Sequence, residues 1–182
     1  MSNNREEYVY KDQVHLFLAL QKPSKQGVGN KACIRSIIKH KENEDLKVFE
    51  AKIRALDRGE WRIYRTVNAR DVKKAYKVFM KRMIDYPEKA SCIDSEWRTA
   101  LLQKECKAEK YFMLDVDTKE HKKVAKVLRL LEEHFFLPHD VEAYESPSGW
   151  HYITPPFDSR EVCKLDYVTL LRDGYMFIKE IK

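Results

Sequence analysis

The chain has 182 residues, of which 43% are hydrophobic and 35% charged; this composition excludes an intrinsically disordered protein and allows one domain with its own core. Its net charge of +6 is compatible with a polyanionic partner. No apolar run is long enough to cross a bilayer, and the N-terminus does not resemble a signal peptide. We therefore expect a cytoplasmic protein with no membrane partner.

Cysteine spacing and charge distribution bear on whether the protein binds zinc or a polyanion. The four cysteines stand far apart and form no Cys-x-x-Cys pair, which argues against a zinc ribbon and predicts reduced thiols. Between residues 60 and 89 there are nine Lys and Arg against four acidic residues. Such a basic run is typical of a solvated helix face, and it is also compatible with contacts to phosphate groups.

The N-terminal third gives one clear helix. Residues 14–20 are apolar and fit either a strand or a buried helix, while residues 21–30 contain Pro and two Gly and predict a loop. Apolar residues at helical spacing predict a helix within residues 43–56, which Asp57-Arg58-Gly59 should end.

The middle of the chain predicts a strand followed by two helices. Residues 60–68 are rich in aromatic and β-branched residues and predict the strand. Residues 71–85 predict an amphipathic helix, and a further helix should begin at Asp94 or Ser95. The inward face of the first helix is expected to consist of Val72, Ala75, Tyr76, Phe79 and Met83.

The last third predicts a sheet with helices. A buried strand within residues 111–118 should be followed by a helix that Thr118 caps and that ends before Pro138. The remaining segments read, in order, as two strands, a short helix and a hairpin whose turn is Asp173-Gly174; their ranges are 141–146, 150–154, 159–163, and 167–171 with 175–181. This order predicts an α+β fold with a mostly antiparallel sheet.

Two carboxylates at the end of the strand within residues 111–118 form the first candidate site. Asp115 and Asp117 are two residues apart, so on a strand their side chains point to the same side. Like charges held together repel unless a cation lies between them, and hard divalent ions prefer such oxygen ligands. The alternative is that Asp117 or Thr118 merely caps the next helix.

A turn with the sequence Ser146-Pro147-Ser148-Gly149 forms the second candidate site. A glycine in such a turn lets backbone N–H groups approach an anion closely. His151 follows at the start of the next strand, where it could donate to a phosphate or carry a proton. The alternative is an ordinary hairpin turn followed by an ordinary sheet histidine.

Together the two motifs resemble the archaeo-eukaryotic primase superfamily, also called primase-polymerases. Asp115 and Asp117 match its paired-Asp motif, and Ser148, Gly149 and His151 match its motif of small residues and His, with one extra residue between Ser and His. For the third motif of the family, Leu165-Asp166 is the preferred match and Leu171-Arg172-Asp173 the rival. Residues 62–70 and 153–158 resemble segments of small primase-like proteins of phages and mobile elements.

The resemblance implies an RRM-like catalytic module over residues 60–182. Residues 1–59 match nothing in that family, and we expect them to form an N-terminal α/β extension packed on the module in one compact domain. The resemblance also implies joining of nucleotides on a DNA or RNA template with two Mg²⁺ or Mn²⁺ ions. The metal ligands would be Asp115, Asp117 and Asp166. The catalytic residues would be the same three aspartates and His151. The residues that contact the nucleotide would be Ser148, Gly149, His151, Arg65, Asn68 and Arg70.

The partners implied are nucleoside triphosphates, single-stranded or primer-template DNA, and a replication protein such as a helicase, in the host cytoplasm if a phage encodes the chain. One alternative is a non-catalytic primase-like protein that binds nucleic acid or nucleotides as a regulator or inhibitor. A phosphatase of the haloacid-dehalogenase type also begins its domain with a similar Asp-x-Asp strand, but it needs a second Asp pair downstream, and no such pair follows Asp117.

Overall fold

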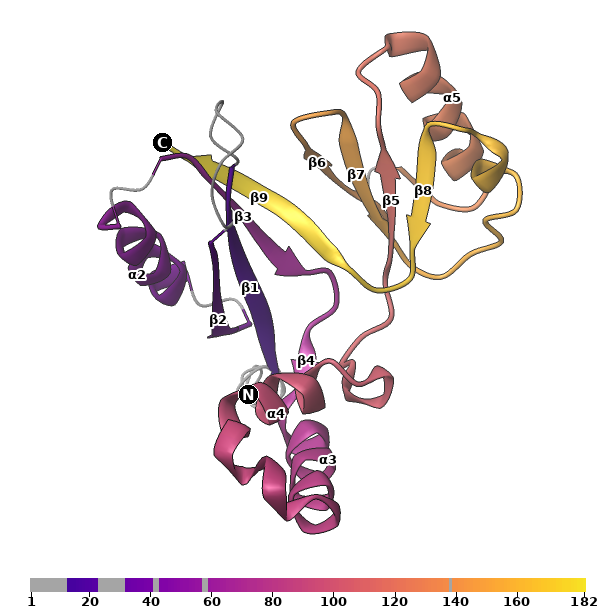
Figure 1. Cartoon of the computed structure of the whole chain (residues 1–182). Coiled ribbons are helices and arrows are strands. Elements are labelled where there is room, and N and C mark those ends of the chain that lie inside the picture. Colours follow the sequence, from indigo (N-terminus) through magenta and orange to yellow (C-terminus); the bar gives the residue numbers. More distant parts are fainter. Residues whose placement is uncertain (1–12, 23–31, 41–42, 57–58, 138) are drawn as a thin grey trace, which may run out of the picture.

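Two antiparallel sheets, joined side by side, form the framework of the protein (Figure 1). The computed structural model describes residues 13–22, 32–40, 43–56, 59–137 and 139–182. Helices pack on both faces of the first sheet and on one face of the second, so the expected α+β class is confirmed. Within these residues no helix has the length and apolar character that crossing a bilayer requires.

The first sheet is built from both ends of the chain. Its strands run in the order β2-β1-β3-β9, and the short β4 also pairs with β1. Their bounds are Gln13–Gln21 for β1, Cys33–Lys39 for β2, Trp61–Thr66 for β3, Arg70–Asp71 for β4 and Tyr175–Ile181 for β9. The apolar segment of residues 14–20 therefore forms β1. Strands from before residue 59 (β1 and β2) and strands from after residue 60 (β3, β4 and β9) belong to this one sheet.

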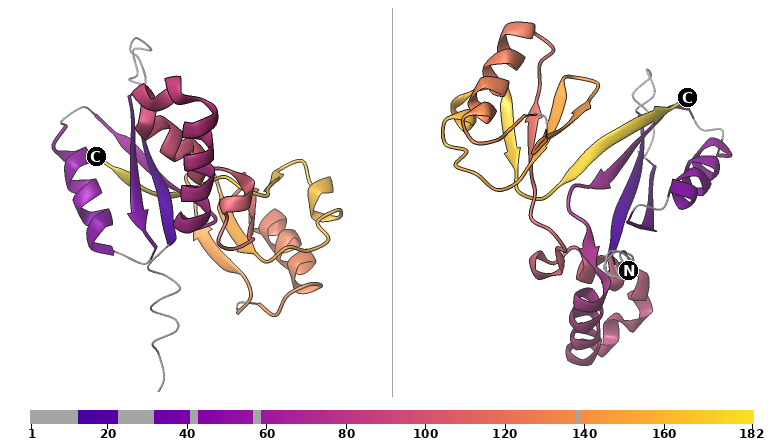
Figure 2. Two further views of the ribbon diagram at one scale, coloured as in Figure 1. Left: turned by 90° about the horizontal axis from the view of Figure 1, so that it is seen from below. Right: turned by 180° about the vertical axis from the view of Figure 1, so that it is seen from behind.

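Helices lie on both sides of the first sheet (Figure 2, left). On one side α2 (Asn43–Arg54) packs Phe49 and Ile53 against apolar side chains of the strands, Phe17 and Ile63 among them. On the other side lie α3 (Val72–Asp85) and α4 (Ile93–Leu101), linked by the 3₁₀ helix η1 (Pro87–Cys92); the 3₁₀ helix η2 (Lys104–Cys106) follows. Alternation along β1 thus places successive side chains in two different cores.

The second sheet has the strand order β6-β7-β5-β8, with every neighbouring pair antiparallel. Its elements follow along the chain as β5 (Phe112–Val116), α5 (His121–Glu132), β6 (Glu142–Glu145), β7 (Trp150–Thr154), the 3₁₀ helix η3 (Val162–Lys164) and β8 (Val168–Leu171). This is the βαββαβ order of a ferredoxin-like unit, with the second helix shortened to one 3₁₀ turn.

Strand β5 is buried on both faces, which explains its unbroken apolar sequence. Leu114 and Val116 pack on the α5 side, together with Val127 and Leu131 of that helix. Met113 points to the opposite face and packs against side chains from the first sheet, including Met176 of β9. The face of β5 that carries Met113 therefore looks toward the first sheet.

The expected hairpin at Asp173-Gly174 is wrong. β8 pairs with β5 in the second sheet, whereas β9 pairs with β3 in the first, so this dipeptide connects the two sheets. Asp173 accepts a hydrogen bond from Arg70 and forms an ion pair with Lys107 at the crossing. Asp173-Gly174 has the composition of a turn, but the strands before and after it pair with strands of different sheets.

Three helix details also differ from expectation. Helix α5 begins at His121 after Glu120, and Thr118 instead accepts a hydrogen bond from the Glu120 N–H. The short helix expected at residues 159–163 is the 3₁₀ turn η3. Tyr76 of α3 is 56% exposed, so it does not belong to the inward face of that helix.

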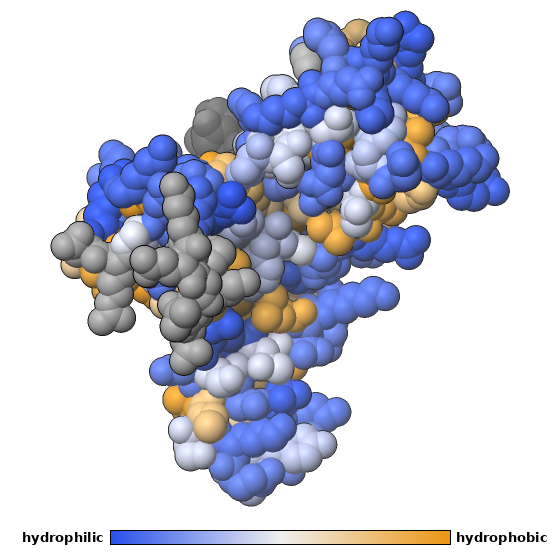
Figure 3. Space-filling view, turned by 45° about the horizontal axis from the view of Figure 1, so that its top comes forward, coloured by the Kyte–Doolittle hydropathy of each residue, from blue (hydrophilic) through white to orange (hydrophobic). Residues whose placement is uncertain are grey.

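Parts of three further expectations lie outside the described residues: most of the loop at 21–30, the helix stop at Asp57-Arg58, and Pro138. The helix that precedes Asp57-Arg58, α2, ends at Arg54, and Gly59 has a φ of 77°, which favours glycine. On the face drawn in Figure 3 the surface is mostly hydrophilic, with smaller apolar patches.

Candidate functional site

A transverse row of side chains crosses the second sheet on the face that looks toward the first. The row consists of residues that stand directly opposite one another on neighbouring strands: Tyr144 on β6, His151 on β7, Asp115 on β5 and Thr169 on β8. Directly opposed residues of antiparallel strands share a face, and Asp115 shares that of Met113 because the two are separated by one residue. Both motifs of the sequence therefore meet on this face.

The centre of the row is the pair Asp115–His151. Oδ1 of Asp115 lies 3.3 Å from Nε2 of His151, and their side chains are 29% and 7% exposed. Nδ1 of His151 is buried and has no hydrogen-bond partner among the described residues. A buried ring nitrogen without a partner is costly, so this side chain is held at a cost in stability.

The turn that follows β6 lies directly on the end of β5. A Cβ atom added to Gly149 would stand 1.8 Å from the Val116 carbonyl oxygen, so no larger residue fits here without movement of backbone. Inside the turn, Ser146 Oγ accepts a hydrogen bond of 3.0 Å from the Gly149 N–H. Glycine is therefore required at position 149, because the backbone of the turn lies against the backbone of residues 116 and 118. This contact places the turn next to the Asp-x-Asp motif.

The second carboxylate of the motif is bound by this turn. Ser148 Oγ donates a hydrogen bond of 2.9 Å to Asp117 Oδ1. The Asp117 N–H in turn donates to the Tyr167 carbonyl oxygen, which ties the end of β5 to the start of β8. Asp117 and Ser148 are both exposed at the rim of the row, so a ligand reaches them from solvent.

The two carboxylates that matched the third motif of the primase family lie elsewhere. Asp166 is exposed beside α5, where its charge adds to the hydrogen bond that Lys123 donates to Glu120 in raising the pKa of Lys123. Asp173 is paired with Arg70 at 2.7 Å. On β8 the residue that faces Asp115 is the neutral Thr169, so the row itself contains one carboxylate.

The two carboxylates of the Asp-x-Asp motif supply fewer ligands than a divalent ion needs to complete its coordination. Within the described ranges no three His, Cys, Asp or Glu side chains come close enough to hold a metal ion jointly. Mg²⁺, however, commonly takes one or two protein carboxylates and shares its remaining positions with water and substrate phosphates. Asp115 and Asp117 fit that lower requirement, and Asp166 does not join them.

A cleft of about 650 Å³ lies between the two sheets next to the row. Tyr144, Ile153 and Glu142 of the second sheet line one wall, and His15, His40 and Arg65 line the other. Burial, followed by the hydrogen bond that its hydroxyl donates to Glu142, raises the pKa of Tyr144. The cleft thus has an acidic wall and a basic wall.

Of the three side chains expected from the first sheet and its loop, only Arg65 reaches the cleft. Asn68 is buried and clamps the chain before β5, because its amide accepts from the Tyr111 N–H and donates to the Tyr111 carbonyl. Arg70 is 1% exposed and forms the ion pair with Asp173. The structure gives Asn68 and Arg70 positions in the interior and does not bring them to Asp115.

Sequence reasoning missed His15, His40 and Tyr144 of the cleft. The available signal was weak: His15 is the one polar side chain within the otherwise apolar segment of residues 14–20, and its meaning depended on assigning that segment as a strand. His40 lies just after β2, so its proximity to His15 follows from the β1–β2 pairing and not from sequence spacing.

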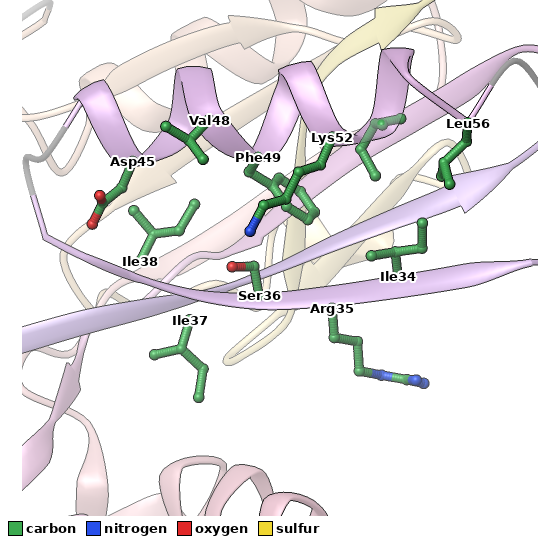
Figure 4. A pocket seen from close by; sticks show the side chains of 11 residues that line it. Ile34, Arg35, Ser36, Ile37, Ile38, Asp45, Val48, Phe49, Lys52 and Leu56 are labelled. Carbon is green, nitrogen blue, oxygen red and sulfur yellow. The ribbon is translucent and has the colours of Figure 1, made fainter.

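A second hollow of about 540 Å³ lies between α2 and β2. Figure 4 shows Val48, Phe49 and Lys52 reaching from the helix toward Ile34, Ser36 and Ile38 of the strand, while Arg35 and Ile37 point away. Its lining is mainly aliphatic, and its polar residues, Asp45, Lys52, Ser36 and Arg35, belong to neither of the two sequence motifs. The cleft between the sheets is therefore the better candidate for chemistry.

No protein-family model, no curated protein and no solved structure matches the chain. The geometry of the row and the cleft is therefore the basis for inferring a function.

Proposed function

We propose that the chain is a primase-polymerase-like nucleotidyltransferase that joins nucleotides on single-stranded or primer-template nucleic acid with the help of Mg²⁺ or Mn²⁺. The observation that carries the proposal is that the two motifs contact each other at two places, Asp115 with His151 and Asp117 with Ser148, on a sheet whose neighbouring residue Tyr144 lines a cleft of about 650 Å³. A cytoplasmic location and a replication partner such as a helicase belong to the same proposal.

Each residue has a role that its surroundings support. Asp115 and Asp117 would hold the divalent ions, which supply charge neutralisation at the phosphates and activation of the attacking hydroxyl. Ser148 would redirect to the triphosphate the hydrogen bond that its hydroxyl donates to Asp117, and Gly149, whose N–H is bound by Ser146, would allow the turn to approach the phosphates closely. His151, with one ring nitrogen toward Asp115 and the other unpartnered, would contact a phosphate or carry a proton.

Arg65 supports the same proposal from the opposite wall. It lines the cleft beside Tyr144 and is half-buried, which suits a guanidinium that binds phosphate through two N–H groups. The exposed lysines of α3, Lys77 and Lys81, add positive charge on the opposite side of the first sheet from α2, where a nucleic acid strand that extends beyond the cleft would meet it.

A second candidate is a primase-like module that binds nucleotides or nucleic acid without chemistry. The observation that favours it is Thr169, since this neutral residue occupies the β8 position opposite Asp115. Phosphate contacts require no third carboxylate, whereas a tightly held pair of metal ions gains from one. The two candidates differ in whether Asp115 and Asp117 are needed for turnover.

The deciding experiment is incorporation of labelled nucleotides on single-stranded and primer-template DNA with Mg²⁺ or Mn²⁺. Wild type is compared with Asp115→Asn, Asp117→Asn and the control Asp85→Asn, which removes an exposed carboxylate from α3. Asparagine keeps the shape of the side chain and a hydrogen-bond acceptor for Ser148, so the folded state should persist. Product from wild type and Asp85→Asn alone would support nucleotidyl transfer.

Absence of product from every variant, with nucleotide or DNA binding intact in each, would select the binding module. Asp166→Asn adds a separate measurement on the third motif. Loss of product in this variant would show that a carboxylate outside the row takes part, and would contradict the assignment of the metal ligands to Asp115 and Asp117 alone.

A further inference from the structure

A pair of histidines stands on the wall of the cleft that the first sheet provides. Nε2 of His15 lies 2.8 Å from Nδ1 of His40, and Nδ1 of His15 lies 2.9 Å from the Thr66 carbonyl oxygen. His15 is buried, and both rings line the cleft together with Arg65. Neither histidine belongs to the motifs that carry the proposed function.

The direction of the hydrogen bonds in this pair follows from elementary chemistry. A carbonyl oxygen can only accept, so Nδ1 of His15 must carry the proton that it donates to Thr66. In its neutral form His15 then has a lone pair on Nε2, and His40 must donate to it from Nδ1–H. A second proton on His40 therefore binds at its Nε2, and His15 acts as the fixed acceptor that favours the charged ring.

The surroundings keep the charge off His15. Burial, and then the nearby charges of Arg65 and His40, lower the pKa of His15 to about 3. His15 therefore stays neutral across the physiological range. The charged and titratable groups that line the same cleft or its extension under α2 are Lys39 and Arg65 on this wall, and Glu109, Tyr111, His139, Asp140, Glu142 and Tyr144 across it.

We propose that His40, oriented by His15 and assisted by Arg65, forms an anion site on this wall that binds a phosphate group more tightly when His40 is protonated. The inference rests on the proposed function and deepens it, because the phosphate would belong to the nucleotide or to the nucleic acid in the cleft. It assigns the wall opposite the Asp115–His151 row to substrate binding and makes that binding sensitive to pH.

Binding of inorganic tripolyphosphate at pH 6 and pH 8, measured by calorimetry, tests the shared chemistry. Relative to His40→Gln, wild type should gain about tenfold in affinity between pH 8 and pH 6, the value of one charge-assisted hydrogen bond. Protonation of the ligand itself affects both proteins equally and cancels in this comparison. The matched control His121→Gln, which removes an exposed histidine at the start of α5, should behave as wild type.

The same titration with a nucleoside triphosphate and with a short single-stranded oligonucleotide identifies the source of the phosphate. A pH effect of His40 on the triphosphate alone assigns the site to the incoming nucleotide, and an effect on the oligonucleotide alone assigns it to the template. An equal pH effect in wild type and His40→Gln for every probe, or no binding of any probe, would overturn the proposal.

Proton NMR of the wild-type histidine rings gives a test that needs no variant to fold. The His15 signals should stay constant between pH 5 and pH 8, whereas the His40 signals should titrate, with a midpoint that tripolyphosphate raises. Titration of His15 in this range would contradict the proposal. Failure of nucleotide incorporation leaves these outcomes unaffected, so the binding inference and the proposed catalysis can fail separately.

Discussion

Asp115 and His151 face each other on neighbouring strands, although the two motifs that contain them lie far apart in the sequence. Their register is fixed on one side by the β5–β7 ladder and on the other by the contact of the Gly149 turn with the end of β5. The geometry of the candidate site therefore depends on a turn that contributes few side chains of its own.

Gly149→Ala should lower the free energy of unfolding by at least about 2 kcal/mol, since the new methyl group would meet the Val116 carbonyl and displace backbone. Gly174→Ala is the matched control: its Cβ would meet only Leu171 side-chain atoms at ordinary contact distance, 3.5 Å and beyond. Urea denaturation of both variants measures the difference. Equal stability of the two would contradict the close packing of the turn.

The buried ion pair between Arg70 and Asp173 should support the crossing between the sheets. Asp173→Asn is expected to cost about 3 kcal/mol or more, because it leaves the guanidinium of a residue that is 1% exposed without its charge partner. The control Glu161→Gln breaks an exposed pair with Lys164 and should cost less than about 1 kcal/mol. Denaturant unfolding compares them, and a small loss of stability for Asp173→Asn would show that water or the asparagine oxygen is enough to compensate the guanidinium.

Local sequence patterns predicted the elements around the site well. Residues 150–154 and 175–181 agree with β7 and β9, and the amphipathic pattern of residues 71–85 agrees with α3. These predictions succeed because alternation and helical spacing are properties of neighbouring residues. The α+β class follows from the order of such elements, and that order could also be predicted.

The partners of the strands could not be predicted in the same way. Asp173-Gly174 has the composition of a hairpin turn, yet β9 leaves the sheet of β8 because its apolar side chains pack against β3 and α2. Within the candidate site the same limit applies. Asp115 meets His151 through a ladder between adjacent strands, and Asp117 is bound by Ser148 of the turn between β6 and β7. Arg70 instead forms an ion pair that depends on the connection between the two sheets.

Binding of single-stranded DNA should weaken with salt, and log affinity should fall linearly with log salt concentration. If the α3 lysines contact phosphates, the double variant Lys77→Gln/Lys81→Gln should reduce the slope by about 0.7 for each phosphate that it no longer neutralises. Lys47→Gln, on α2 at the other side of the first sheet, should leave the slope unchanged. Fluorescence anisotropy at several salt concentrations checks this, and an unchanged slope in the double variant would remove α3 from the nucleic acid surface.

The free energy of unfolding should fall as the pH is lowered, and the proton uptake of His15 on unfolding should cause part of this fall. The pKa of His15 is about 3 in the folded protein against an ordinary value of 6.5, so below pH 6.5 the unfolded chain binds a proton that the folded chain does not. The stability contribution is thus fully present above pH 6.5 and is lost as the pH falls toward 3, with a slope of up to about 1.4 kcal/mol per pH unit.

His15→Asn removes the titrating ring and keeps an N–H donor that can serve the Thr66 carbonyl, so its stability should depend less on pH between 6.5 and about 4 than that of wild type. Carboxylates contribute equally to both proteins, and the difference between the two curves isolates His15. Urea unfolding at a series of pH values measures that difference. Parallel curves would mean that His15 takes up a proton in the folded state, with His40 or Thr66 moving to accommodate it.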